Sequence, residues 1–192
     1  MRIQQAIEDS IKLKQTLLND TRFMQQIQKT IDVIVEAYGE NKKVLFCGNG
    51  GSAADAQHLA AELSGRFYYD RPPLYAEALH VNTSYLTAVA NDYSYDDIFA
   101  RILKASGHQR DVLVGISTSG NSKNVVKAFE IAKQKNITTI ALTGEGGGQM
   151  GLLSDILPAV PSKDTPRIQE SHIMIGHIIC EMVEKALFPQ KE

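Results

Sequence analysis

Two polar residues one helical turn apart, His58 and Glu62, are the first pair in this chain whose types and spacing suit chemistry. At a spacing of four residues, both side chains lie on one face of a helix and within mutual reach. An imidazole and a carboxylate placed in this way can transfer protons or bind a metal ion. A half-buried histidine beside a solvated glutamate also occurs on many helices without a site, so the pair alone does not establish one.

A second set of polar residues interrupts the otherwise apolar last helix, predicted over residues 166–187: Gln169, His172 and His177. At ~100° per residue, Gln169 lies about 60° from His172 and about 80° from His177, so all three fall on one broad stripe. They are either hydrogen-bonding groups of the core or residues of a site. Along the axis, Gln169 and His177 are ~12 Å apart. One chain brings both to one metal ion only if both side chains bend toward the same point; otherwise a second subunit supplies one ligand.

A glycine-rich turn, residues 48–52, joins an apolar strand at 44–47 to the helix that carries His58. We expect Ser52 to cap this helix, with Asp55 completing a capping-box-like pair. The N–H groups and dipole of a helix N-terminus favour an anion. The turn fits a loose dinucleotide fingerprint, but strand two ends without the acid that would hold a ribose. We interpret it as a phosphate or sugar cradle, with a purely structural turn as the alternative.

The loop Ser-Thr-Ser-Gly-Asn-Ser, residues 117–122, is the better phosphate candidate. It follows the carboxyl end of a predicted strand and opens a helix, which is where ligands of parallel sheets bind. It lacks the lysine of a Walker motif, so a phosphate held there is an anchor and not a transferred group. The alternative is a hydroxyl-rich turn that only caps its own helix.

Apolar runs that alternate with helical patterns predict a three-layer α/β/α fold with a five-stranded parallel sheet, flavodoxin-like. We treat residues 1–192 as one domain whose α/β core covers 40–192. Residues 1–39 form two helices, broken near 19–21, that make no crossover and are expected to pack outside the core or against a second subunit. The predicted strands span residues 44–47, 76–81, 111–117, 137–143 and 156–160.

Composition excludes several classes of function. The net charge is −2 without long basic runs, which argues against a nucleic-acid partner. No run approaches the ~18 to 20 apolar residues of a membrane span, and the first residues lack a signal peptide's apolar segment. The two cysteines, Cys47 and Cys180, are expected to be buried reduced thiols. These features predict a cytoplasmic protein.

Five stretches taken together carry a resemblance to a known family. They are Cys-Gly-Asn-Gly-Gly-Ser-Ala-Ala-Asp-Ala-Gln-His (47–58), Ala-Ala-Glu-Leu-Ser-Gly-Arg (60–66), Ala-Asn-Asp (90–92), Gly-Ile-Ser-Thr-Ser-Gly-Asn-Ser (115–122) and Arg-Ile-Gln-Glu-Ser-His-Ile (167–173). From about residue 40 to the end, the chain resembles the sugar-isomerase (SIS) domain family and, within it, the phosphoheptose isomerases. The resemblance implies interconversion of sedoheptulose 7-phosphate and D-glycero-D-manno-heptose 7-phosphate, which supplies heptose for lipopolysaccharide or other surface glycans. It also implies a cytoplasmic homotetramer with sites between subunits.

The resemblance also implies the roles of individual residues. Glu62 and His177 would be the catalytic acid/base pair, and one Zn²⁺ per subunit would be bound by His58, Glu62, Gln169 and His177. The residues implied to hold the substrate are Gly50, Gly51, Ser52, Glu62, Asn91, Asp92, Ser117, Thr118, Ser119, Ser122 and Gln169. Pro166 is a local departure from the family pattern, but it suits the start of a helix.

Isomerisation moves a proton between neighbouring carbons through an enediol while the two oxygens exchange another. Glu62 suits the carbon base and His177 the oxygen acid/base. A carboxylate bound to a metal is a weaker base, so the two roles of Glu62 are partly in conflict, and the sequence leaves them open. The alternatives are an isomerase of another phosphosugar and a catalytically silent SIS-domain regulator of the DnaA-binding type. Those regulators lack the Glu and the final His that are present here.

Overall fold

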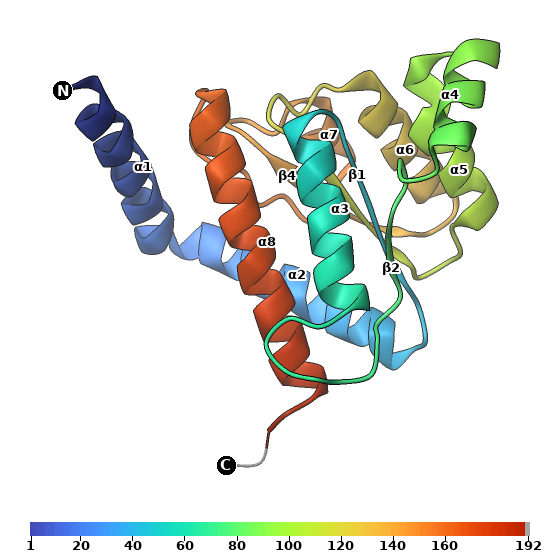
Figure 1. Cartoon of the computed structure of the whole chain (residues 1–192), viewed down its shortest axis with the longest axis horizontal. Coiled ribbons are helices and arrows are strands. Elements are labelled where there is room, and N and C mark those ends of the chain that lie inside the picture. The colour runs from blue at the N-terminus through green and yellow to red at the C-terminus, as the bar shows by residue number, and fades with distance from the viewer. Residues whose placement is uncertain (191–192) are drawn as a thin grey trace.

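The computed structural model describes residues 1–190 and contains one parallel sheet of four strands (Figure 1). The strands run in the order β2-β1-β3-β4, with bounds β1 (Val44–Gly48), β2 (Ala76–Ala78), β3 (Val112–Ser117) and β4 (Thr138–Thr143). The helices are α1 (Arg2–Asn19), α2 (Thr21–Gly39), α3 (Gly51–Ser64), α4 (Thr83–Asp92), α5 (Ile98–Ser106), α6 (Lys123–Gln134), α7 (Gly148–Leu153) and α8 (Thr165–Leu187), with a 3₁₀ turn, η1 (Tyr95–Asp97).

The two faces of the sheet build two separate apolar cores, because side chains alternate along a strand. On one face, Val44 and Phe46 of β1 pack in a cluster with residues of α2, α3 and α8. On the other, Leu45 and Cys47 pack in a cluster supplied mainly by α5 and α6. β1 and β3 are buried throughout, as expected of strands covered by helices on both sides. The predicted three-layer α/β/α fold is confirmed.

The expected fifth strand is reduced to two isolated parallel bridges at the edge of β4, which pair Ile140 with Ile156 and Thr143 with Ala159. Pro158 lies between these bridges. A proline has no N–H to donate to the ladder, so continuous pairing is interrupted there. Strand two is also shorter than predicted, because only residues 76–78 pair with β1.

The two N-terminal helices have different roles. α2 carries Phe23, Ile27 and Ile31 into the core beside α8, so the expectation that both helices lie outside the core is wrong for α2. α1 buries only Leu17 among its residues and projects from the body of the fold (Figure 1). In the part of the chain that the structure describes, no helix is both long and apolar enough to cross a membrane.

α3 and α8 lie side by side on the same face of the sheet (Figure 1). Their close approach depends on Gly176 of α8, because a Cβ at this position would lie 2.5 Å from the methyl carbons of Leu59 in α3. This contact places the middle of α3 against the middle of α8. Residues next to it, His58 and His177, are therefore brought together.

Candidate active site

The centre of the candidate site is a cluster of three side chains from α3 and α8, which we call the surface cluster: His58, Glu62 and His177. The Nε2 atom of His58 lies 3.0 Å from Nε2 of His177 and 3.3 Å from Oε1 of Glu62. The two imidazole rings meet edge to face, with centroids 5.2 Å apart. The side chain of His58 is 48% exposed and that of Glu62 is 23% exposed, so solvent and ligands reach both.

The donor set of the surface cluster suits zinc, since two imidazoles and one carboxylate match a common catalytic ligand set. Tetrahedral ligation at ~2.0–2.1 Å requires the two nitrogens to be about 3.3 Å apart. The observed 3.0 Å between His58 and His177 is that of a hydrogen-bonded pair, a few tenths of an ångström closer. Among residues 1–190, no group of three or more His, Cys, Asp or Glu side chains is already arranged to hold a metal ion. The chemistry of the donors therefore fits the ion, and a small separation of the two rings is required.

Gln169 lies at the other end of the α3–α8 contact. Its amide nitrogen would be 2.7 Å from a Cβ placed on Gly51, so it covers the first residue of α3. Within the described chain, no hydrogen bond joins Gln169 to the surface cluster. The structure thus brings together three of the four predicted zinc ligands and places the fourth beside the glycine turn.

Two further residues near the surface cluster, Asp55 and Phe67, are not among the site residues predicted from the sequence. Asp55 lies one turn before His58 on α3; burial raises the pKa of its carboxyl, whereas the charges of His58 and His177 act to lower it. Its spacing of three residues from His58 was the available signal. The ring of Phe67 lies 5.9 Å from that of His177, and no local pattern predicts this contact.

His172, the remaining polar residue of the α8 stripe, is a core residue. It is fully buried, and its Nε2 lies 3.1 Å from the carbonyl oxygen of Thr143. Burial lowers the pKa of His172 to about 4, although the hydrogen bond to Thr143 acts in the opposite direction. His172 is therefore a hydrogen-bonding group of the core and not a residue of the site.

The glycine turn opens α3 in a way that differs from the prediction. α3 begins at Gly51, and its N-cap is Gly50, with φ of 56° and no side-chain cap. The predicted capping role of Ser52 is therefore wrong: Ser52 is already the second helical residue, and it is buried. A glycine is favoured at the cap because a positive φ is strained for other residues. The N–H groups of Ser52 and Ala53 already donate to the backbone carbonyls of Asn49 and Gly50, so within α3 the N–H of Gly51 is the one left for a ligand among the described residues.

The hydroxyls of the 117–122 loop bond to one another and do not cap the following helix. Oγ of Ser117 lies 2.9 Å from Oγ of Ser122 and 3.4 Å from Oγ of Ser119. Ser122 is the N-cap of α6 but makes no side-chain capping bond. The alternative that this loop serves only to cap α6 is therefore not supported. Its hydroxyls converge at a helix N-terminus, an arrangement that suits an anion.

A pair of amides joins the glycine turn to the first turn of α6, the helix that follows the hydroxyl loop. The side chains of Asn49 and Asn124 exchange two hydrogen bonds, of 2.9 and 2.8 Å, and the Tyr95 hydroxyl donates to Asn49 at 3.0 Å. Asn91 and Asp92 lie at the exposed end of α4, shortly before Tyr95, where the Asn91 amide donates to the Asp92 carboxylate. The segments that follow β1 and β3 are thus held next to each other.

The sequence of this chain is similar to the sequences of known proteins. Residues 10–144 match the SIS domain family. The chain belongs to the SIS domain family. It is 53% identical over 189 residues to the phosphoheptose isomerase of Clostridium acetobutylicum, which covers 98% of this chain and 96% of that protein. The resemblance predicted from the sequence motifs is confirmed.

Solved structures of similar proteins have the same fold. The phosphoheptose isomerase GmhA from Neisseria gonorrhoeae superposes with a TM-score of 0.90 at 40% identity, covering 96% of this chain and 97% of that one. A phosphoheptose isomerase from Francisella tularensis superposes with a TM-score of 0.92 at 36% identity, with the same coverage.

Proposed function

We propose that this chain is an aldose–ketose isomerase that converts sedoheptulose 7-phosphate to D-glycero-D-manno-heptose 7-phosphate. The observation that carries this proposal is the surface cluster, in which a carboxylate and an imidazole from different helices meet around His58 within 3.3 Å. The names and identities of the relatives support the same activity.

The reaction needs two proton transfers, and the surface cluster supplies a group for each. Glu62 takes the proton from the hydroxyl-bearing carbon next to the ketone and returns it to the neighbouring carbon, which passes the substrate through an enediol. His177 moves the proton between the two substrate oxygens. Positioned acid/base groups of this kind contribute roughly 10²- to 10⁴-fold each to rate.

The phosphate of the substrate binds away from the reacting carbons, in the loops at the carboxyl ends of β1 and β3. Ser117, Ser119 and Ser122 converge there beside the N-terminus of α6. Holding the distant phosphate orients the reacting end of the sugar, which lowers the entropic part of the barrier. Gly50, Gly51 and Ser52 hold the sugar beside Gln169, while Asn91, Asp92 and Thr118 bind its remaining hydroxyls.

We further propose that His58, Glu62 and His177 hold one Zn²⁺ per subunit, with Gln169 as the fourth ligand. When bound, the ion would polarise the substrate's oxygens as a Lewis acid. Because Gln169 lies beside Gly51, its participation requires a change of its side chain or a Gln169 from a neighbouring subunit. The carboxylate of Glu62 has two oxygens, so one can bind the ion while the other accepts a proton.

We also propose a homotetramer with sites at subunit interfaces. The apolar stripe of α1 supports this assembly: Ile3, Ile7 and Ile11 are more than half exposed and line a groove between α1 and α8. A contiguous apolar stripe of this kind is typical of an interface. The buried reduced cysteines, Cys47 and Cys180, favour a cytoplasmic location, where the product would supply heptose for lipopolysaccharide or other surface glycans.

The rival function is that of a catalytically silent SIS-domain regulator, and direct incubation separates the two. Purified protein is incubated with sedoheptulose 7-phosphate, and new anomeric signals are followed by NMR. We expect signals of the aldose to appear with wild-type protein and not with Glu62→Gln. If the wild type produces none, in the presence or absence of Zn²⁺, the proposed function is wrong. Conversion of a different ketose phosphate instead would change the substrate assignment.

The phosphate assignment has its own test in a double variant, Ser119→Ala with Ser122→Ala. We expect KM to rise on the order of 100-fold or more, since two hydrogen bonds to a charged group, each worth ~1.5–3 kcal/mol, are lost. Inorganic phosphate should inhibit the wild type competitively and the variant more weakly. Ser162→Ala, which lies outside the loop, is the control. An unchanged KM together with no inhibition by phosphate would remove this loop from substrate binding.

A further inference from the structure

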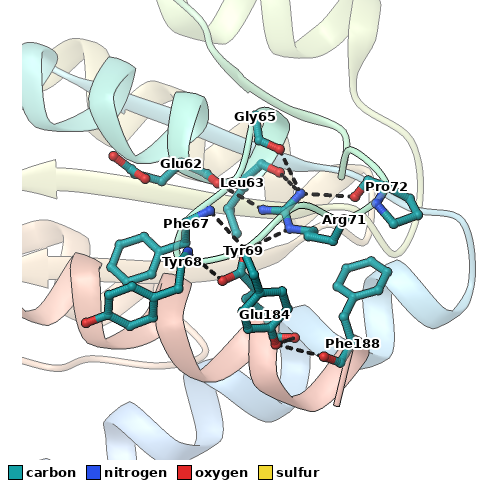
Figure 2. A network of polar contacts seen from close by, with 10 residues as sticks. All are labelled: Glu62, Leu63, Gly65, Phe67, Tyr68, Tyr69, Arg71, Pro72, Glu184 and Phe188. Atoms are coloured by element: carbon teal, nitrogen blue, oxygen red, sulfur yellow. Dashed lines mark hydrogen bonds and ion pairs between the residues drawn. The ribbon is translucent and has the colours of Figure 1, made fainter. Parts of the chain in front are cut away.

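The segment that leaves α3, residues 65–72, is fixed by a buried ion pair between Arg71 and Glu184 of α8 (Figure 2). The two side chains are 2% and 1% exposed, and Nε of Arg71 donates to Oε1 of Glu184 at 3.0 Å. A charged pair this deeply buried is costly unless every polar atom is satisfied. We call this pair, with the hydrogen bonds described next, the buried clamp.

The guanidinium of Arg71 closes the C-terminal end of α3. Its Nη2 donates to the carbonyl of Glu62 at 2.9 Å, and its Nη1 donates to the carbonyls of Leu63 at 2.8 Å and Gly65 at 3.2 Å. The last carbonyls of a helix lack partners within it and carry its negative dipole end, so a cation is favoured there. Only the planar fork of an arginine can reach these carbonyls and the carboxylate at once.

The carboxylate of Glu184 fixes the loop that follows. Its Oε1 accepts from the backbone N–H of Phe67 at 2.9 Å, and its Oε2 accepts from that of Tyr68 at 2.7 Å. The hydroxyl of Tyr69 adds a bond of 2.7 Å to the carbonyl of Phe188, beyond the end of α8. Burial alone raises the pKa of Glu184, but the hydrogen bonds from Tyr68, Phe67 and Arg71 prevail and hold it below its ordinary value.

Both ends of the buried clamp lead to residues of the proposed acid/base pair. Arg71 binds the backbone of Glu62, whose carboxylate points away from the guanidinium in Figure 2. Glu184 fixes the backbone of Phe67, whose ring lies 5.9 Å from that of His177. Glu184 itself lies two turns beyond His177 on α8.

We propose that Arg71 and Glu184 are positioning residues for the isomerase reaction: they fix the distance between the Glu62 carboxylate and the His177 imidazole by locking the end of α3 and the Phe67 loop onto α8. This inference rests on the proposed function, because Glu62 and His177 are its acid/base pair. Neither Arg71 nor Glu184 contacts the substrate in this scheme.

Arg71→Lys is the decisive variant, because it keeps the positive charge but loses the fork that spans four carbonyls, that of Pro72 included, and a carboxylate. We expect a folded protein whose kcat falls on the order of 10- to 100-fold, since displacement of a reacting group by about 1 Å has this effect. KM should change by less than about threefold, because the phosphate loops are untouched. Arg110→Lys is the matched control: Arg110 pairs with Glu36 and Glu40 on the surface, and its variant should keep wild-type kcat.

A second measurement separates this inference from the proposed function. With histidine labelled at ¹³Cε1 and assigned by single His→Gln substitutions, NMR reports the His58 and His177 rings at one fixed pH without any substrate. We expect both signals to shift in Arg71→Lys while that of His108 stays in place. If the wild type fails to isomerise the heptulose phosphate yet the signals shift, the function is wrong and the positioning of the cluster stands.

Wild-type kcat and unshifted His58 and His177 signals in a folded Arg71→Lys would overturn the proposal. If Arg71→Lys does not fold, Phe67→Leu decides, because it keeps the backbone N–H donated to Glu184 and removes only the ring beside His177. We expect it to shift the His177 signal and to lower kcat by a smaller factor than the lysine variant. No change in either quantity would equally overturn the proposal.

Discussion

The surface cluster and the buried clamp lie between the same two helices, α3 and α8. Their polar groups differ in exposure to solvent and in the number of hydrogen bonds they make. In the surface cluster, His58 has two polar neighbours, at 3.0 and 3.3 Å, and its side chain is about half exposed. In the buried clamp, the Glu184 carboxylate accepts from Arg71 and from two backbone N–H groups and is almost inaccessible. The surface cluster can therefore still form hydrogen bonds or bind a ligand, whereas the buried clamp has few unused hydrogen-bonding groups.

The comparison shows how this fold separates reactivity from rigidity. A buried charge that loses a partner has no water to replace it, so saturated groups resist change. An exposed group can exchange a protein partner for water, a metal ion or a substrate at small cost to folding. Substitutions in the surface cluster should therefore affect turnover, and substitutions in the buried clamp should affect folding as well.

The largest effect is expected for the proton-transfer residues. Glu62→Gln or His177→Gln should lower kcat by roughly 10²- to 10⁴-fold, because each removes a positioned acid/base group. The free energy of unfolding should change by less than about 1 kcal/mol, because Glu62 and His177 are not part of the buried core and glutamine keeps a polar side chain there. Steady-state kinetics measures the change in kcat, and urea unfolding measures the change in the free energy of unfolding. Near-normal kcat in either variant would remove that residue from its role.

Truncating a side chain of the buried clamp should lower the free energy of unfolding much more than the substitutions in the surface cluster do. Arg71→Met leaves the Glu184 carboxylate buried without its cation, which should reduce the free energy of unfolding by about 3–5 kcal/mol. Replacing both partners, with Arg71→Met and Glu184→Leu together, should recover part of this loss, because no charge then remains buried. Urea unfolding measures both, and Arg110→Met is the surface control. A double variant as unstable as the sum of the two single variants would contradict this account.

The third expected effect concerns His172, a buried group of α8 that should make stability depend on pH. Its pKa lies at about 4 in the fold, against 6.5 when unperturbed, so between these pH values the unfolded chain binds a proton that the folded chain does not. Stability therefore falls as the pH is lowered through this range, by roughly 3 kcal/mol. His172→Gln should remove this contribution, as measured by urea unfolding at pH 7 and pH 4.5. An equal loss in variant and wild type would rule out His172 as its source.

Glu184 should contribute a second loss of stability in acid. Because its pKa is lowered in the fold, its stabilisation is present above the unfolded pKa and disappears as the pH falls through the folded value.

The smallest effect distinguishes the proposed zinc ligands. His58→Ala should lower zinc content more than Gln169→Ala does, because His58 contacts both Glu62 and His177 whereas Gln169 lies beside Gly51. Both variants should lose activity. Metal analysis of the purified proteins measures this directly, with Gln149→Ala as a control. Full zinc occupancy in His58→Ala would overturn the ligand assignment.

Most of the fold follows from periodicity in the sequence. Apolar runs such as residues 112–117 predict strands covered on both faces, and glycine or hydroxyl-rich turns after them predict where the ligand loops lie. The predictions of the fifth strand and of the α3 cap were wrong because of single residues. Pro158 interrupts the predicted fifth strand, and Gly50 takes the capping position expected of Ser52.

The sequence by itself determined which groups are available: the four-residue spacing of His58 and Glu62, the polar stripe of α8 and the hydroxyl loop all follow from local pattern. Only the tertiary structure decided which of them meet. His58 and His177 are 119 residues apart, and Arg71 and Glu184 are 113 apart. These contacts depend on how closely α3 approaches α8 at Gly176, which local periodicity does not encode. The same packing buries His172 and Glu184: burial makes His172 a neutral core residue, whereas hydrogen bonds from Tyr68, Phe67 and Arg71 keep the buried Glu184 a carboxylate.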